Sequence, residues 1–379
     1  MDFLKRIIVV ALLMLIFLAG CGRAEKISSD MLPTTVASEE LTDFKIGVLV
    51  GAGGVEDDGF NESAWKGIIQ YTNRFPNVFA QMVYPHGNTL EDRFNAAEDL
   101  ITVDTDIVIA LGSEYNDVIA LLQDENPSVK FILVDGALDN VNENTVVVTF
   151  AEQEAGFLAG VVAALQSPNN KLGFIGGYQE PSIERYGLGF LAGIAYINEK
   201  FGTGSEVLGF EFQGSFNEVD GGRKLAKEMF NQGVDTLFVA ARSTGIGVMN
   251  EAKARLERNE KIYIIGADKD QYLNGKIIDG RSVVLTSVVK EMDSVLYHLL
   301  NAYAQNKFPG GQTLVNTIAN NGIGLEKTNH NLTYETKVKL EEIEGMIRTG
   351  KLIIPSSSSE LVQMIINYGY KVNFEPAFR

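Results

Sequence analysis

The chain has 379 residues, with 32 Lys and Arg against 49 Asp and Glu, three His and one Cys. This length suggests two or three domains, and 45% hydrophobic with 21% charged residues is typical of a globular protein. A net charge of −17 argues against binding of a nucleic-acid polymer, and a single Cys excludes disulfide frameworks and multi-cysteine metal sites. We therefore expect neither a cofactor nor a metal site.

The first twenty residues have the pattern of a secretory signal peptide. Lys5 and Arg6 precede an unbroken apolar run over 7–18. At about 1.5 Å per residue this run is too short for a bilayer core of about 30 Å. It leads into the sequence LAGC at 18–21, which resembles the lipobox of bacterial lipoproteins. The resemblance implies that residues 1–20 are removed and that Cys21 is lipidated, which anchors the chain to the cell membrane, facing the extracytoplasmic side. The alternative is an ordinary signal peptide with a chance cysteine.

Residues 21–43 are polar and lack periodicity, so we expect a flexible tether after the lipidated Cys. From residue 44 onward, runs rich in Val, Ile and Leu alternate with helical patterns of 10–15 residues. Such alternation indicates parallel sheets that are covered on both faces. The predicted strands are 44–50, 78–84, 106–112, 130–136 and 145–150 in a first series, and 171–177, 207–212, 236–241, 261–268 and 281–289 in a second.

Two series predict an α/β protein of two doubly wound parallel-sheet lobes, joined by crossings near 150, near 285 and near 315–325. Lobe 1 would take residues 44–150, completed by about 286–320. Lobe 2 would take residues 151–285, completed by part of 321–379. Ligands of such sheets bind outside the carboxyl ends of the strands, so the residues that follow strands are the candidate site residues in a cleft between the lobes.

The glycine-rich segment at 51–65, GAGGVEDDGFNESAW, lacks the dinucleotide fingerprint because Glu56 stands where the third Gly is needed. Asp57 and Asp58 suit the positive end of a helix dipole, so helix capping or ligand hydrogen bonding is favoured over an acid–base pair. The chain has no G-x-S-x-G, H-E-x-x-H or Walker A motif. We therefore predict a binding protein and not an enzyme, while a hydrolase that uses only carboxylates stays an alternative.

Two phenylalanines follow strands of different lobes. Phe60 comes after the first strand of lobe 1, and Phe216 comes after the second strand of lobe 2. Two rings that face each other across a cleft can hold a flat base, with about 1–3 kcal/mol from each stacking contact. The alternative, that both rings belong to the lobe cores, is equally compatible with their spacing.

Several blocks of sequence, in order, resemble the basic membrane protein family of bacterial lipoproteins. They are KIGVLVGAGGVEDDGFNESAWKG, FAEQEAGFLAGVVAAL, GFIGGYQEPSIERYGLGFLAGI, GSFNEVDGGRKLAKEMFNQGVDTLFVAA, IIGADKDQ and TSVVKEMD, between residue 44 and about residue 325. The resemblance implies a type I periplasmic-binding-protein fold. It also implies a substrate-binding protein of an ABC transporter, of the type that binds purine nucleosides.

The resemblance assigns roles to six residues. Phe60 and Phe216 would sandwich the purine, and Asn61 and Asp135 would hydrogen-bond the base. Asp268 would accept hydrogen bonds from the ribose hydroxyls, and Lys290 would donate to the same sugar. Losing one partner of such a buried set costs about 1–3 kcal/mol.

Two positions depart from the family pattern. Gly51 stands where the first strand usually ends in Asp, and ARSTG at 241–245 replaces the family's Ala-Gly-Gly-Thr-Gly turn. Arg242 is a seventh candidate site residue. It could stack, donate to a carbonyl edge such as O6 of guanine or inosine, pair with Asp57 or Asp58, or shrink the pocket.

The leading hypothesis is a lipid-anchored monomer that closes two lobes over adenosine, guanosine or inosine and delivers it to ABC permease subunits. The first alternative is a sensing or surface-interaction lipoprotein of the same fold that has lost transport. The second is a receptor for a different small polar ligand, because lobes of this type also hold sugars and amino acids.

Overall fold

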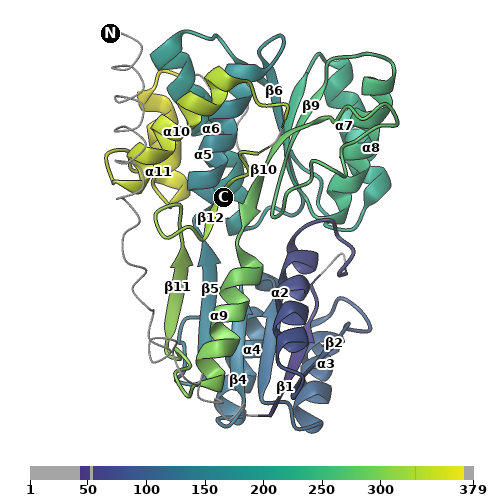
Figure 1. Cartoon of the computed structure of the whole chain (residues 1–379), viewed down its shortest axis with the longest axis vertical. Helices are drawn as coiled ribbons and strands as arrows, with labels where there is room; N and C mark the ends of the chain where they lie inside the picture. Colours follow the sequence, from purple (N-terminus) through teal and green to yellow (C-terminus); the bar gives the residue numbers. More distant parts are fainter. Residues whose placement is uncertain (1–42, 52–53, 329, 371–379) are drawn as a thin grey trace, which may run out of the picture. The chain divides into compact units, whose positions relative to one another are not determined.

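The computed structural model describes residues 43–51, 54–328 and 330–370. The expected signal peptide, the expected lipidation site at Cys21 and most of the expected tether lie outside the described residues. The described chain forms two six-stranded sheets (Figure 1). We call the first sheet with its helices lobe 1 and the second sheet with its helices lobe 2.

Five strands of lobe 1 come from the first part of the chain, and the sixth returns late. In spatial order the sheet is β2-β1-β3-β4-β5-β11, and every neighbouring pair is parallel. All five residues of β3 are buried, as expected for a central strand that is covered on both faces. The strands are β1 (Phe44–Leu49), β2 (Val78–Val83), β3 (Ile107–Leu111), β4 (Lys130–Val134), β5 (Thr145–Phe150) and β11 (Gln312–Asn316).

Lobe 2 repeats this arrangement with one difference. Its order is β7-β6-β8-β9-β10-β12, parallel throughout except that β12 runs antiparallel to β10. The strands are β6 (Lys171–Gly176), β7 (Glu206–Phe212), β8 (Thr236–Ala240), β9 (Tyr263–Gly266), β10 (Val284–Lys290) and β12 (Ile323–Leu325). The predicted α/β class with two parallel-sheet lobes is confirmed, and β12 is a short antiparallel edge strand that the sequence pattern did not predict.

Helices cover both faces of each sheet. In lobe 1, α2 (Phe60–Arg74) and α9 (Met292–Ala304) pack side by side on one face (Figure 1), while α3 (Leu90–Thr102) and α4 (Asn116–Glu125) pack on the other. In lobe 2, α5 (Glu152–Gln166) and α6 (Pro181–Phe201) cover one face, and α7 (Val219–Asn231) and α8 (Ser243–Glu257) cover the other. The late helices α10 (Tyr334–Arg348) and α11 (Ser358–Asn367) pack on α5 and α6, respectively.

Helices α5 and α6 approach each other closely because small residues face the contact. A Cβ atom on Gly160 would lie 2.1 Å from the carbonyl oxygen of Phe190, and one on Gly193 would lie 2.1 Å from the carbonyl oxygen of Phe157. The two backbones therefore touch directly. This contact fixes the start of α5, which is the first segment of lobe 2 after the chain leaves β5.

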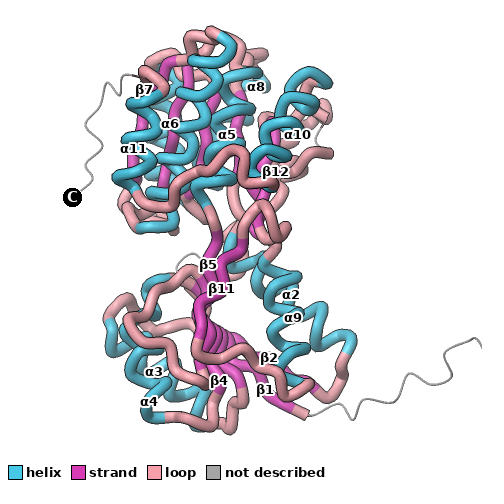
Figure 2. The backbone as a smooth tube through the Cα atoms, turned by 90° about the vertical axis from the view of Figure 1, so that its left-hand side faces the viewer, coloured by secondary structure: helices cyan, strands magenta, loops and turns pink. Residues whose placement is uncertain are grey.

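The chain passes between the two sheets at three places: from β5 to α5, from β10 to α9 and from β11 to β12. In lobe 1, β5 and β11 lie side by side, so two of these passages start from neighbouring strands (Figure 2). The expected boundary near residue 285 differs from the strand positions, because β10 stays in the lobe 2 sheet as far as Lys290. The strand begins inside the apolar run SVVLTSVV, at Val284, and ends at Lys290, a predicted site residue.

Candidate functional site: a cleft with two buried cations

The strand order places the candidate residues at the switch point of each sheet. In both lobes the strand order read from β2 or β7 is 2-1-3-4-5, so the crevice opens where the first and third strands are neighbours. Gly51 and Glu114 follow β1 and β3 of lobe 1, and Arg242 follows β8 of lobe 2. These three residues meet, although 128 positions separate Glu114 from Arg242.

Phe60 is the first residue of α2, and Asp57 holds it there. The Asp57 carboxylate is buried and accepts backbone N–H bonds from Gly59 at 3.0 Å, Asn61 at 2.9 Å and Glu62 at 3.2 Å. These are donors that the first turn of a helix otherwise leaves unsatisfied. Burial raises the pKa of Asp57, while the backbone donors oppose that rise. Asp57 is therefore a helix cap, as the sequence favoured, and the cap fixes the position of the Phe60 ring.

Phe216 lies in the loop between β7 and α7 and is 3% exposed. Its carbonyl oxygen accepts the backbone N–H of Thr244 at 3.1 Å, and the Tyr178 ring packs edge-on against its ring at 5.2 Å. The loop of Phe216 is thus tied to the start of α8, directly after Arg242. Phe216 and Arg242 are therefore held close to each other within lobe 2.

Arg242 brings the two phenylalanines together. Its guanidinium carbon lies 4.6 Å from the centre of the Phe60 ring and 4.3 Å from the centre of the Phe216 ring, within the range of cation–π contacts. One guanidinium nitrogen lies 3.4 Å from a carboxylate oxygen of Glu114. The side chain of Arg242 is only 6% exposed. Arg242 therefore contacts both rings, and its pairing with Glu114 was not among the alternatives that the sequence left open.

The backbone of Arg242 is strained. Its φ is +46° and its ψ is −132°, a conformation that costs a non-glycine residue about 1–3 kcal/mol. Among the described residues, the other non-glycine positions with positive φ are all Asp or Asn, and they include Asp135 and Asp268. Three of the seven predicted site residues therefore adopt positive φ directly after a strand, and Arg242 is the one whose residue type tolerates it least.

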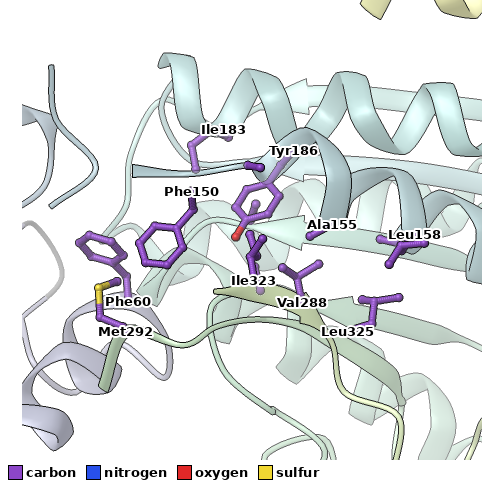
Figure 3. Close-up of a cluster of buried hydrophobic side chains, with 14 of the residues drawn as sticks. Phe60, Phe150, Ala155, Leu158, Ile183, Tyr186, Val288, Met292, Ile323 and Leu325 are labelled. Carbon is purple, nitrogen blue, oxygen red and sulfur yellow. The ribbon is translucent and has the colours of Figure 1, made fainter. Parts of the chain in front are cut away.

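Lys290 is a second buried cation, at the end of β10. Its ammonium group pairs with Asp135 of lobe 1 and, at 2.9 Å, with Glu152 at the start of α5. It also lies 5.5 Å, 4.9 Å and 5.4 Å from the ring centres of Phe60, Phe150 and Tyr186. Figure 3 shows these three rings in one buried cluster, with Met292 beside Phe60.

The charges around Lys290 are balanced by ion pairs. Glu152 is fully buried and forms ion pairs with both Lys290 and Arg185, the latter at 2.7 Å. Burial raises the pKa of Asp135 to about 7, with a further rise from Glu152, while the Lys290 ammonium opposes both. The carboxylates in turn raise the pKa of Lys290. The Oδ1 atom of Asp135 accepts no hydrogen bond from the described part of the chain, so this buried acceptor is open to a ligand.

Asp268 and Asn61 complete the predicted set. Asp268 follows β9, is 8% exposed and accepts the hydroxyl of Tyr186 at 3.2 Å. The side-chain amide of Asn61 donates to the carbonyl oxygens of Gly51 at 3.3 Å and Gly54 at 2.9 Å. Asn61 therefore holds the loop after β1 in place. This role differs from the hydrogen bond to a base that the resemblance implies.

Direct contacts between the lobes surround this set, and several of them involve residues that were not predicted as ligand-binding residues. Lys269 pairs with Glu62 at 2.6 Å, and the Gln271 amide donates to the carbonyl oxygen of Asp58 at 2.7 Å. Ser113 donates to Glu180 at 2.8 Å. Lys269 and Ser113 follow strands, and this position is the sequence feature that points to a place in the cleft. Glu152, Phe150 and Tyr186 gave no signal distinct from core residues.

Two cavities border the predicted site residues. A small one of about 10 Å³ is bordered by Arg242, Asp268 and Gln271 among others. A larger one of about 370 Å³ is bordered by Asp135, Ser113, Gln153, Glu180 and Arg185 among others. This volume falls in the range of about 300–1,000 Å³ typical of small-molecule sites.

The described residues offer neither a metal-binding cluster nor a membrane-spanning helix. Across residues 43–51, 54–328 and 330–370 there is no cluster of three or more His, Cys, Asp and Glu that could hold a metal ion. Within the same ranges none of the helices has the length and apolar character needed to cross a bilayer.

Known proteins support the fold. Residues 44–358 match the family model described as "ABC transporter substrate-binding protein PnrA-like". An ABC transporter solute-binding protein from Aeropyrum pernix K1 superposes with a TM-score of 0.75 at 21% identity, covering 86% of this chain and 98% of that one. The predicted periplasmic-binding-protein fold is thus confirmed.

Relatives of known sequence agree. The chain is 32% identical over 367 residues to "ABC transporter nucleoside-binding protein BmpA" of Lactococcus lactis subsp. cremoris, covering 93% of this chain and 99% of that protein. It is 29% identical to a "CD4+ T-cell-stimulating antigen" of Listeria monocytogenes over the same shares of the two chains. The resemblance seen in the sequence is confirmed, and the chain belongs to the PnrA-like family of ABC transporter substrate-binding proteins.

Proposed function

We propose that this protein captures a purine nucleoside between its two lobes and delivers it to the permease subunits of an ABC transporter. One observation carries the proposal: Phe60 and Phe216, from different lobes, both contact the flat guanidinium of Arg242. Two rings that can hold one flat group can hold another, and a purine gains about 1–3 kcal/mol from each ring. The nucleoside-binding relative supports the choice of ligand class.

The polar residues around the rings suit the other parts of a nucleoside. In the proposal, Asp268 accepts the vicinal hydroxyls of ribose, Lys290 donates to the same sugar, and Asp135 and Asn61 hydrogen-bond the base. The buried, open Oδ1 of Asp135 supports this role, because an unsatisfied buried acceptor costs about 1–3 kcal/mol and a ligand N–H would recover it.

Calorimetric titration of the purified protein tests the proposal. We expect adenosine, guanosine or inosine to bind with a Kd of about 100 μM or tighter, equivalent to about −5.5 kcal/mol, and cytidine and uridine to bind more weakly. Asp268→Ala should weaken a ribonucleoside about tenfold and its 2′-deoxy analogue much less, because the deleted carboxylate faces the missing hydroxyl. Absence of binding by all five nucleosides would refute nucleoside capture.

Anchoring and delivery are separate parts of the proposal. The lipobox supports a lipid anchor at Cys21, with the protein facing the extracytoplasmic side as a monomer. Cys21→Ser should abolish incorporation of labelled palmitate and release the protein from the membrane. Deletion of the gene should lower nucleoside uptake by cells, and unchanged uptake would argue for a sensor that has lost transport.

A receptor for a different small polar ligand is the second candidate. The buried position of Arg242 against both rings and the cavity of about 370 Å³ favour it. Gln153 and Asp135 each present to that cavity's border a buried oxygen that accepts no hydrogen bond from the described residues. Mass spectrometry of any ligand retained through purification separates the two candidates.

A further inference from the structure

We propose that Arg242 is a built-in competitor for the base: its guanidinium occupies the place that a purine stacked on Phe60 and Phe216 must take, and binding exchanges one for the other. This inference rests on the proposed function and adds the residue that sets its affinity. Arg242 has two possible roles, which the experiments below distinguish. As a competitor it occupies the place of the base against the two rings, and as a reader it hydrogen-bonds the edge of the bound base.

Arg242 blocks a base from the two rings sterically. Guanidinium and base are both flat, and the guanidinium carbon already lies within 4.6 Å of one ring centre and 4.3 Å of the other. The side chain of Arg242 is only 6% exposed, so it is enclosed where it contacts the two rings. A base can contact both rings only after Arg242 has left them.

The lack of a side chain at Gly51 leaves room for Arg242. A Cβ atom on Gly51 would lie 3.0 Å from a guanidinium nitrogen of Arg242 and 2.9 Å from the Glu114 carboxylate. It would also lie 2.4 Å from the carbonyl oxygen of Leu111, so the backbone itself would have to move. Gly51 therefore leaves room for the ion pair of Arg242 with Glu114. The two departures from the family pattern, Gly51 and Arg242, therefore depend on each other sterically.

Arg242 can leave the two rings. Its contact with Glu114 is long, at 3.4 Å, and Glu114 is 18% exposed, so the carboxylate can be hydrated when the arginine moves. Burial opposes the charge of Arg242, but Glu114, Glu180, Asp57 and Asp268 together raise the pKa of Arg242. Carboxylates other than Glu114 therefore also stabilise the guanidinium, and they can do so after it leaves Glu114.

A competitor and a reader give opposite results in one titration series. Wild type, Arg242→Gly and Arg242→Lys are titrated with adenosine, inosine and guanosine, and Arg258→Gly, an exposed arginine at the end of α8, is the matched control. A competitor predicts that Arg242→Gly binds all three at least tenfold tighter, by a similar factor for each, with Arg242→Lys between and Arg258→Gly unchanged. If Arg242→Gly weakens inosine and guanosine but not adenosine, Arg242 reads O6 and the inference is overturned.

The remaining outcomes separate this inference from the proposed function. If wild type binds nucleosides and Arg242→Gly binds them no tighter, the inference fails and the proposed function stands. If only Arg242→Gly binds, the inference holds and nucleoside capture by the natural protein fails. If neither binds, both fail.

A second readout does not depend on ligand. In the free protein, the side-chain N–H resonance of Arg242 should be shifted by the two rings and slow to exchange with water, because the group is stacked and buried. This resonance should be missing in Arg242→Gly and should lose its shift in Phe216→Ala. An unshifted, rapidly exchanging Arg242 resonance would overturn the inference even if nucleosides bind.

Discussion

The cleft contains two buried cations that lie against aromatic rings, and they are held in different ways. Lys290 pairs with Asp135 and with the fully buried Glu152, which is itself paired with Arg185. Arg242 has a long contact to the partly exposed Glu114 and a strained backbone. The comparison teaches that burial and ring contacts alone do not make a cation structural. Lys290 belongs to the framework that joins the lobes, whereas we propose that Arg242 occupies a place that a ligand can take.

The largest expected effect comes from removing the framework cation. Lys290→Met leaves Asp135 and Glu152 buried without their shared ammonium, and breaking a buried pair in this way costs about 3–5 kcal/mol of the free energy of unfolding. Urea unfolding followed by circular dichroism measures it. Arg242→Met is the matched control and should lose less than half as much, because Glu114 can be hydrated. Equal losses for the two variants would end the distinction between the cations.

The next effect concerns the rings. Phe216→Ala should weaken purine nucleosides by about 1–2 kcal/mol, the lower part of the range for a stacking contact, because Arg242 also loses a ring and competes less well. Phe79→Ala on β2, whose ring is 67% exposed, is the control and should bind as wild type does. Calorimetry measures both. An unchanged affinity for Phe216→Ala, with an unchanged unfolding midpoint, would exclude Phe216 from the site.

A smaller effect should follow pH. Because burial raises the pKa of Asp135 to about 7, this carboxylate takes up a proton as pH falls from 8 to 6, and it then no longer accepts a donor from the base at full strength. Affinity should fall by up to about tenfold over that interval. The folded state also binds this proton more tightly than the unfolded state, so the stability it adds is lost as pH rises from about 4 to about 7. Asp135→Asn should remove both dependences, and a persistent pH dependence in that variant would assign it to another group.

The smallest effect should be the stability change in Arg242→Gly. Glycine relieves about 1–3 kcal/mol of backbone strain, while the lost cation–π contacts are worth about 1–2 kcal/mol, so the two nearly cancel. We expect the free energy of unfolding to change by about 1 kcal/mol or less. A loss comparable to that of Lys290→Met would mean that Arg242 is structural after all.

The sequence predicted the fold well because its evidence is local. Strands such as β3 are buried on both faces and therefore read as unbroken apolar runs, which identified two parallel sheets without any knowledge of contacts. The helix cap at Asp57 is equally local, since acceptor and donors lie within five residues.

The occupant of the aromatic slot could not be predicted in this way. It depends on Gly51, Glu114 and Arg242 meeting at the ends of β1, β3 and β8, which only the folded strand order brings together. The same holds for Glu152, whose pairing with Lys290 crosses from α5 to the end of β10. The sequence could identify Gly51 and Arg242 as unusual, but their relation to each other is a property of the tertiary structure.

The most direct test of the account is a crystal structure of the protein grown with inosine. We expect that structure to show the hypoxanthine ring against both Phe60 and Phe216, the ribose hydroxyls at Asp268, and the Arg242 guanidinium displaced from both rings. A structure with inosine bound elsewhere in the cleft and Arg242 still against the two rings would contradict it.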